Sequence, residues 1–90
     1  MTAVKDNRDL RRFELEEEGL TAFANYARNG LHVVIPYVEA PPALRGHGTA
    51  ARLMEGIVAR ARAEGFRITP TCSYAFAWFK RHKNAQDVLA

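Results

Sequence analysis

The amino-acid sequence predicts a mixed α/β fold, in which an antiparallel β-meander is followed by a βαβ unit and a C-terminal helix. Three observations support this prediction. Residues 11–39 alternate between apolar and polar side chains and are divided by turn signals. Residues 50–61 place apolar side chains at helical spacing. Residues 66–72 alternate again, as a further strand would.

The length and composition fit one globular domain over residues 1–90. A chain of 90 residues buries only about 60–65% of its unfolded surface, so it holds one modest core. Its hydrophobic content of 48% and charged content of 26% are ordinary for a folded protein. The net charge of +3 fits a solvated surface or an anionic ligand, and composition does not choose between them.

The meander is expected to contain three strands. Phe13 and Leu15 alternate with charged residues and share one face of the first strand. In the second, every other residue from Leu20 to Tyr26 shares one face. Asn29-Gly30 is a hairpin signal, because both residues tolerate positive φ. The third strand runs on to Val38 through a proline.

A helix is expected over residues 47–64. Its apolar residues form one continuous stripe: Ala50, Leu53, Met54, Ile57, Val58 and Ala61. The strand over 66–72 should then lie parallel to the third strand, joined to it by a right-handed crossover. A second helix is expected over 74–83, with Phe76 and either Phe79 or Lys80 on one side and Trp78 elsewhere.

The segment Arg45-Gly46-His47-Gly48-Thr49-Ala50 lies where the third strand leads into the helix. A helix N-terminus has unpaired N–H groups and a partial positive charge. Glycines let an anion approach the backbone closely, and an arginine adds a fork for phosphate oxygens. The sequence therefore predicts a pyrophosphate site here. The alternative is that the glycines only shape a tight turn.

The same segment resembles the coenzyme A motif of the GNAT (N-acetyltransferase) superfamily, Arg/Gln-x-x-Gly-x-Gly/Ala. Its defined positions are filled by Arg45, Gly48 and Ala50. The run from Val38 to Gly48, together with Pro70-Thr71-Cys72 and Arg81-His82, is similar to a short single-domain branch of that superfamily. The resemblance covers residues 11–89 in matching order.

The resemblance implies an acetyl-CoA-dependent transfer of an acetyl group to an amine, whose identity the sequence does not give. The alternative is a non-catalytic module that binds acyl-CoA. In this superfamily, two strands part and the pantetheine arm lies between them. Pro36 and Pro70 fall in the two strands concerned, and each removes a ladder donor. They equally fit edge or bulged strands.

The implied cofactor-binding residues are Arg45, Gly46, His47, Gly48, Thr49, Ala50 and, at the end of the second helix, His82.

The candidate catalytic residues are Glu39, Cys72 and Tyr74. Glu39 ends the third strand and suits a general base, although it also fits a solvated carboxylate. The thiol of Cys72 would accept an acyl group or simply pack. The usual acid of the superfamily is a tyrosine, whose position falls near Phe79, so Tyr74 is the substitute. The chain begins directly with its first strand, so substrate helices ahead of it are not expected.

The remaining features of the sequence mainly exclude other kinds of site and other classes of protein. With one cysteine, no disulfide forms within the chain, and His32, His47 and His82 show no metal-binding spacing. The N-terminal residues lack a signal peptide and no segment is apolar enough to span a membrane, so a cytoplasmic protein is expected. Basic pairs favour nucleic acid weakly, and the glutamates at 14 and 16–18 argue against it. The oligomeric state stays open.

Overall fold

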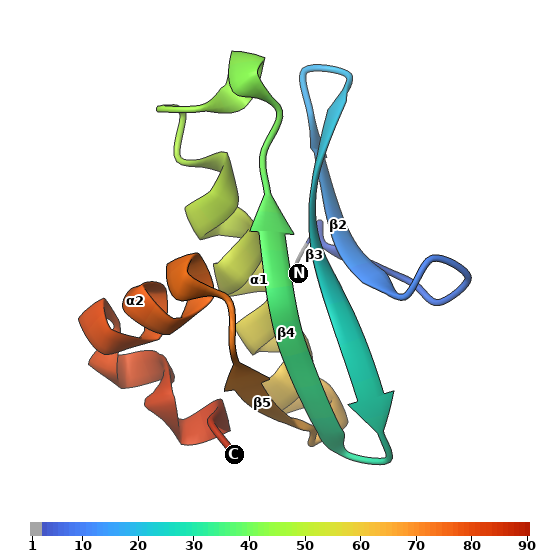
Figure 1. Ribbon diagram of the computed structural model, residues 1–90, viewed down its shortest axis with the longest axis vertical. Helices are drawn as coiled ribbons and strands as arrows, with labels where there is room; N and C mark the ends of the chain where they lie inside the picture. Colours follow the sequence, from blue (N-terminus) through green and yellow to red (C-terminus); the bar gives the residue numbers. More distant parts are fainter. Residues whose placement is uncertain (1–2) are drawn as a thin grey trace.

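The protein, described from a computed structural model over residues 3–90, contains a mixed sheet of five strands (Figure 1). The strands are β1 (Lys5–Asn7), β2 (Arg12–Glu17), β3 (Leu20–Asn29), β4 (His32–Glu39) and β5 (Arg67–Pro70). They lie in the order of the chain, with antiparallel pairing from β1 to β4 and parallel pairing of β4 with β5. The predicted meander and βαβ unit are therefore confirmed.

The alternation in β2 and β3 sorts their side chains onto two faces. Phe13 and Leu15 on β2 are buried, as are Ala22, Ala24 and Tyr26 on β3. The one departure is at the start of β3, where Leu20 is 36% exposed. The β2–β3 turn takes positive φ at both Glu18 and Gly19, which suits the right-handed twist of a hairpin.

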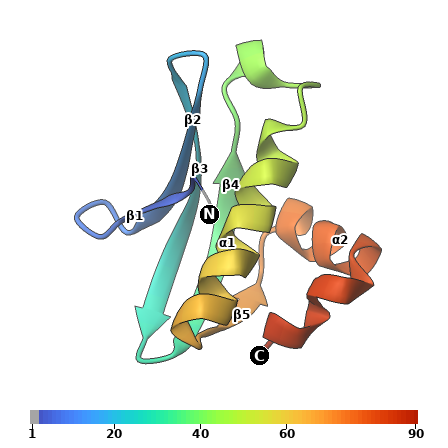
Figure 2. The same ribbon diagram turned by 180° about the vertical axis from the view of Figure 1, so that it is seen from behind.

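Helix α1 (Thr49–Glu64) packs its apolar stripe across one face of the sheet, as seen from behind in Figure 2. It begins at Thr49, not at residue 47, because Gly48 has a left-handed backbone with φ of 78°. At the other end Gly65 is left-handed as well, and its N–H donates to the carbonyl of Ala61 at 2.8 Å. A left-handed glycine with this hydrogen bond is a common C-terminal cap of a helix.

Helix α2 (Ser73–Arg81) lies beside β5, at the end of the sheet away from β1 (Figure 1). Its buried residues are Ala75, Trp78 and Phe79, while Phe76 is 55% exposed. Of the two expected pairings, the structure has Phe76 with Lys80, whose Nζ lies 5.7 Å from the Phe76 ring centroid. Phe79 instead shares the buried stripe with Ala75 and Trp78, which follows the i, i+3, i+4 spacing. The helix ends at Arg81, and a 3₁₀ segment over Lys83–Val88 follows.

Two short elements were not predicted. The strand β1 pairs Lys5 with Glu14 and Asn7 with Arg12, and its polar residues carry no alternation that would signal a strand. A 3₁₀ turn, η1 (Pro42–Leu44), joins β4 to the loop before α1 and buries Leu44. Across residues 3–90, no helix reaches the length and hydrophobicity needed to cross a membrane.

The pairing of β4 with β5 ends halfway along β4. The parallel register runs from His32 opposite Arg67 to Ile35 opposite Pro70. The carbonyl of Ile35 then accepts hydrogen bonds from the N–H groups of both Thr71 and Cys72, each at 3.1 Å. Beyond this point β4 continues beside β3 alone, up to Glu39. The two strands therefore part immediately after the two prolines.

The same prolines explain why the ladder stops. Pro36 and Pro70 lack an N–H and cannot donate to a neighbouring strand. On the other side of β4 the register with β3 shifts between Asn25 and Ala27, so β4 is bulged next to Pro36. Both alternatives raised by the sequence, parting strands and a bulged strand, thus occur at this position.

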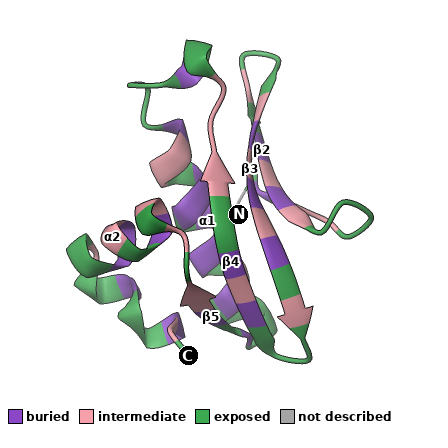
Figure 3. Ribbon diagram, in the orientation of Figure 1, coloured by how far each residue is buried: buried purple, intermediate pink, exposed green. Residues whose placement is uncertain are grey.

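The core lies between the sheet and α1 and continues under α2 (Figure 3). Three aromatic rings form its centre on the meander side, with Phe13 stacked on Phe66 at 5.9 Å and tilted against Tyr26 at 4.7 Å between ring centroids. On the α2 side, Trp78 meets Phe79 edge to face at 5.1 Å. These contacts hold α1 and α2 to the sheet, so the loop between β4 and α1 has fixed ends.

Two phenylalanines on α2 give a matched test of this packing. Phe79 is 2% exposed and Phe76 is 55% exposed. We expect Phe79→Ala to lower the free energy of unfolding by about 3–5 kcal/mol, the cost of a cavity left by a buried aromatic. We expect Phe76→Ala to change it by less than about 0.5 kcal/mol. Urea denaturation of the three proteins measures both values, and equal losses would contradict this assignment of the buried face.

Candidate functional site

The loop over residues 45–48 joins η1 to α1 and presents unpaired backbone donors. Two of its N–H groups are used internally, from Arg45 to Pro42 at 3.2 Å and from His47 to Leu44 at 3.1 Å. The first helical bond of α1 runs from Arg52 to Gly48 at 3.0 Å. Within residues 3–90, the N–H groups of residues 48–51 have no partner, and α1 has no side-chain cap. These donors are available to an anion.

The glycines give the loop its shape. Gly46 and Gly48 have φ of 82° and 78°, a conformation that residues with a side chain rarely adopt. A Cβ added at Gly46 would meet no atom within 4 Å, whereas one at Gly48 would lie 3.1 Å from a guanidinium nitrogen of Arg52. Substitution at either glycine would therefore strain the backbone as well as cover the donors.

A pocket of about 240 Å³ opens beside this loop. It is bounded by the loop, the first turn of α1 and one residue of α2. Its lining residues are Ala40, Leu44, Arg45, Gly46, Gly48, Thr49, Ala50, Ala51 and Tyr74. The lining includes one guanidinium and no carboxylate, which suits an anionic ligand. The structure thus brings Arg45, Gly46, Gly48, Thr49, Ala50 and Tyr74 together.

The side chain of Thr49 does not face this pocket as a donor. It is 1% exposed, and its hydroxyl donates to Glu17 Oε1 at 2.6 Å. Arg52 donates two hydrogen bonds to the same carboxylate, from Nε at 2.7 Å and from Nη2 at 2.8 Å. Only the backbone N–H of Thr49 is then free for a ligand. Its hydroxyl instead ties the first turn of α1 to the end of β2.

The contacts to Glu17 change its acidity. The hydrogen bonds from Arg52, and next those from Thr49, lower the pKa of Glu17 from 4.5 to about 2. Arg52 also donates from Nη2 to the carbonyl of His47 at 2.8 Å, so one guanidinium holds the loop, the helix and β2 together. No local sequence pattern signals this network, because Glu17 and Thr49 are 32 residues apart.

The two candidate histidines lie outside the pocket lining. His47 is half-exposed at the loop tip, with Nδ1 at 3.4 Å from Glu18 Oε2. His82 follows the last residue of α2. Its Nδ1 lies 2.7 Å from the carbonyl of Trp78, and its ring stacks on Trp78 at 4.0 Å between centroids. His82 thus caps the C-terminus of α2 and is not among the residues that line the loop pocket.

Glu39 lies at the end of β4, beyond the point where β5 departs. Its carboxylate accepts a hydrogen bond from the hydroxyl of Tyr37, two residues earlier on the same face. That bond raises the pKa of Tyr37, and the nearby Arg45 opposes the rise. Sequence reasoning missed Tyr37, although the i, i+2 spacing within a strand was a usable signal.

Cys72 and Tyr74 begin α2 on the opposite side of the parted strands. Cys72 is the N-cap residue, half-buried against the core. Tyr74 is also half-buried, and burial raises the pKa of its hydroxyl. Of the three candidate catalytic residues, Tyr74 lines the pocket beside the glycine loop. Glu39 and Cys72 are not among its lining residues, although Glu39 directly precedes the lining residue Ala40.

Comparison with known families agrees with this arrangement. A model of the GCN5-related N-acetyl-transferase family matches residues 12–88, which is most of the chain. The chain therefore belongs to the GCN5-related N-acetyltransferase family. The family supports an acetyltransferase-like function, and the resemblance to GNAT proteins seen in the sequence is confirmed.

A solved structure shows the same fold. The solution structure of a GCN5-like N-acetyltransferase candidate from Staphylococcus aureus superposes with a TM-score of 0.68 and 21% sequence identity. The match covers 100% of this chain and 91% of the other. At that identity the likeness establishes the fold, and the expected mixed α/β fold of GNAT type is confirmed.

Two curated proteins share part of the sequence. They come from two strains of Pseudomonas aeruginosa, and each is named "Probable RNA 2'-phosphotransferase". Each is 38% identical over 66 residues, which is 72% of this chain. The matched part is 36% of their length, so this chain spans about a third of those proteins.

The contacts to Glu17 should make the protein less stable as the pH falls below about 4.5. The pKa of Glu17 is depressed in the folded state, so its contribution to stability is complete above pH 4.5 and is lost as the pH falls toward about 2. We expect Glu17→Gln to lower the melting temperature at neutral pH and to match the parent near pH 2. Glu16→Gln, an exposed neighbour on β2, should have no such pH-dependent effect. A Glu17→Gln deficit that stays constant with pH would contradict the network.

Proposed function

We propose that this chain is an acetyl-CoA-dependent N-acetyltransferase domain over residues 1–90, acting on an amine in the cytoplasm. The observation that carries the proposal is the row of unpaired N–H groups over residues 48–51 beside Arg45, at the mouth of the parted strands. Membership of the GCN5-related family gives the class of reaction. The acceptor amine is not identified by any feature of the site.

The chemistry of the loop fits coenzyme A. A pyrophosphate needs several donors, a favourable helix dipole and close approach to the backbone. The free N–H groups, the start of α1 and the two glycines without side chains supply these. Arg45 adds a charged fork, and its pocket contains no carboxylate that would repel the ligand. When bound, acetyl-CoA would supply an acetyl group activated as a thioester.

The residues around the gap divide the proton transfers between them. We assign Glu39 to take a proton from the acceptor amine, since it is the carboxylate next to the parted strands. Tyr37 acts as a positioning residue, because its hydroxyl donates to that carboxylate. Tyr74 lines the loop pocket, and burial raises its pKa, so it stays protonated at neutral pH and can donate a hydrogen bond or proton there.

One observation favours the second candidate, a module that binds acyl-CoA without catalysis. The position where the superfamily usually carries its tyrosine falls near Phe79, which is 2% exposed and part of the core. The proposal of catalysis then depends on Tyr74 and Glu39. Turnover of acetyl-CoA with a set of amines distinguishes the two candidates. Turnover in the parent that Glu39→Gln abolishes supports the enzyme, and binding without turnover supports the module.

We do not include RNA among the proposed partners. The RNA-related name belongs to relatives of which this chain spans about a third. Glutamates at 14 and 16 alternate along β2, and like charges of this kind oppose a nucleic-acid backbone. A titration with DNA or RNA at several salt concentrations tests this exclusion.

Arg45 gives the first test of the coenzyme A site. We expect Arg45→Ala to weaken coenzyme A binding by about 1.5–3 kcal/mol, the range for a charge-assisted hydrogen bond. Arg45 is exposed, so the melting temperature of the Arg45→Ala protein without ligand should equal that of the parent. Isothermal titration measures the affinity, and Lys83→Ala, which removes a remote exposed charge, should bind like the parent. If Arg45→Ala binds as tightly as the parent, the pyrophosphate lies elsewhere.

Cys72 gives the second test, because it is the one cysteine of the sequence. We expect coenzyme A to slow alkylation of Cys72 by iodoacetamide, since Cys72 is half-buried at the N-cap of α2, where the chain leaves β5 next to the proposed cleft. Intact mass measured over time gives the rate with and without ligand. Arg45→Ala at the same ligand concentration should lose the protection. Equal rates with and without coenzyme A would remove Cys72 from the site.

A further inference from the structure

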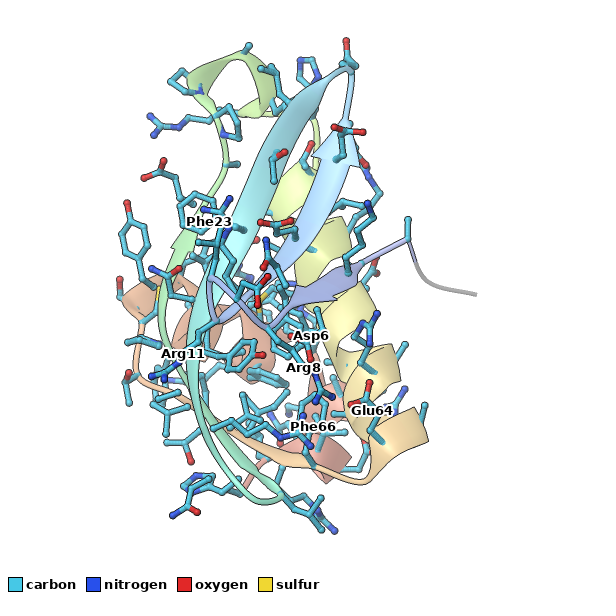
Figure 4. All side chains as sticks on the ribbon, turned by 90° about the vertical axis from the view of Figure 1, so that its right-hand side faces the viewer. Asp6, Arg8, Arg11, Phe23, Glu64 and Phe66 are labelled. Carbon is cyan, nitrogen blue, oxygen red and sulfur yellow. The ribbon has the colours of Figure 1, made fainter. Side chains whose placement is uncertain are left out.

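A second cationic pocket lies away from the glycine loop, where the β1–β2 connection meets the far half of β3. Its volume is about 420 Å³, and its lining residues are Arg8, Arg11, Tyr26, Ala27 and Arg28. Figure 4 shows Arg8 beside Asp6, with Phe66 and Glu64 below them and Arg11 apart on the left of the view. Three of the five lining residues are arginines and none is acidic. The coenzyme A proposal makes no use of this pocket.

The loop that carries two of these arginines is tightly held. Leu10 N–H donates to Asn7 Oδ1 at 3.1 Å, and Arg11 N–H donates to the carbonyl of Arg8 at 3.3 Å. The carbonyl of Arg11 accepts from Tyr26 N–H at 2.9 Å, which fixes the loop to β3. The backbone of Arg11 has a φ of 52°, a conformation that costs energy in any residue but glycine. Glycine would adopt this backbone conformation at a lower energetic cost than the arginine that occupies the position.

The third arginine is positioned in advance. Arg28 Nε donates to the carbonyl of Gly30 at 2.8 Å, and its guanidinium lies over the ring of Phe66 at 5.0 Å. Its Nη1 is buried and makes no hydrogen bond, but it forms an ion pair with Glu64 Oε1 at 3.6 Å. Within residues 3–90, no partner is found for Nη2 of Arg28 or for the guanidinium of Arg11. A fixed guanidinium with a free edge is suited to binding an oxyanion.

Two carboxylates near the pocket, those of Asp6 and Glu64, are bound by neighbouring side chains. Asp6 lies 3.4 Å from Arg8, accepts from the hydroxyl of Tyr26 and has a side chain that is 7% exposed. Glu64 accepts from Arg60 at 2.9 Å. Asp9 lies in the loop itself. Arg8 pairs with Asp6 and Arg28 with Glu64, so among residues 3–90 Arg11 is the lining arginine for which no acidic partner is found.

We propose that this arginine pocket binds the phosphate group of a small phosphorylated molecule. Three guanidiniums offer more donors than the two oxygens of a carboxylate can accept, whereas a phosphate monoester offers three oxygens and about two charges. The donors converge on one hollow, and a nucleic-acid backbone would call for a row of contacts along a surface. The source of the phosphate group, inorganic phosphate or a mononucleotide, is distinguished by experiment.

The test is a ¹H–¹⁵N NMR titration at constant ionic strength, with inorganic phosphate and then with AMP. We expect saturable shifts in the amides of residues 8–12 and 26–30 and in Nε–H of Arg28. Equal affinity for the two probes indicates recognition of the phosphate alone, and tighter binding of AMP indicates a mononucleotide. Shifts confined to residues 45–51 would overturn the proposal, and because they report the glycine loop separately, the two sites cannot be confused.

Arg11→Gly is the decisive variant. It removes one guanidinium and relieves the left-handed backbone, so its melting temperature should equal or exceed that of the parent. We expect phosphate to bind about tenfold more weakly or worse, the loss of one charge-assisted hydrogen bond. Lys83→Ala, in the 3₁₀ segment after α2 and outside the pocket lining, should bind phosphate like the parent.

Two results would contradict the pocket. An equal loss of affinity in Arg11→Gly and Lys83→Ala would mean that only the net charge matters. A single-stranded RNA that binds over a hundredfold more tightly than AMP, with a steep salt dependence, would replace the small molecule with a nucleic acid.

Discussion

The site depends on one constraint in the sheet, the end of the β4–β5 ladder at Ile35. Its carbonyl accepts from both Thr71 and Cys72, and the prolines at 36 and 70 have no N–H with which to extend the pairing. Because β4 continues beside β3 while the chain after β5 turns into α2, Ala40, the residue after Glu39, and Tyr74 on α2 line one pocket. Two missing donors thus shape the proposed cleft.

A second constraint aligns the glycine loop with that gap. The carboxylate of Glu17 holds Thr49 and Arg52, and Arg52 holds the carbonyl of His47. The start of α1 is consequently tied to the β2–β3 end of the sheet through side chains that face away from the loop pocket. The N–H groups of residues 48–51 remain free because the residue at the helix cap, Gly48, has no side chain that could bond to them.

Local patterns predicted those parts of the protein that local physics determines. The alternation of Phe13 and Leu15 and the spacing from Ala50 to Ala61 identified the buried faces of β2 and α1. Contacts between residues distant in sequence were not predictable: the Glu17–Thr49 bond spans 32 residues, and polar β1 is a strand only because β2 pairs with it. The sequence left Phe79 and Lys80 open as the residue beside Phe76, because a nine-residue helix with four aromatic residues allows more than one apolar face. The Tyr37–Glu39 pair needed no distant contact and was simply overlooked.

The most direct test of the account is a crystal structure of the protein with acetyl-CoA bound. The account predicts pyrophosphate oxygens within hydrogen-bond distance of the N–H groups of residues 48–51 and of the Arg45 guanidinium. It also predicts that the pantetheine arm lies between β4 and the start of α2, with the thioester near Glu39 and Tyr74. A pyrophosphate bound elsewhere, for example at Arg8 and Arg11, with the glycine loop uncontacted, would contradict it.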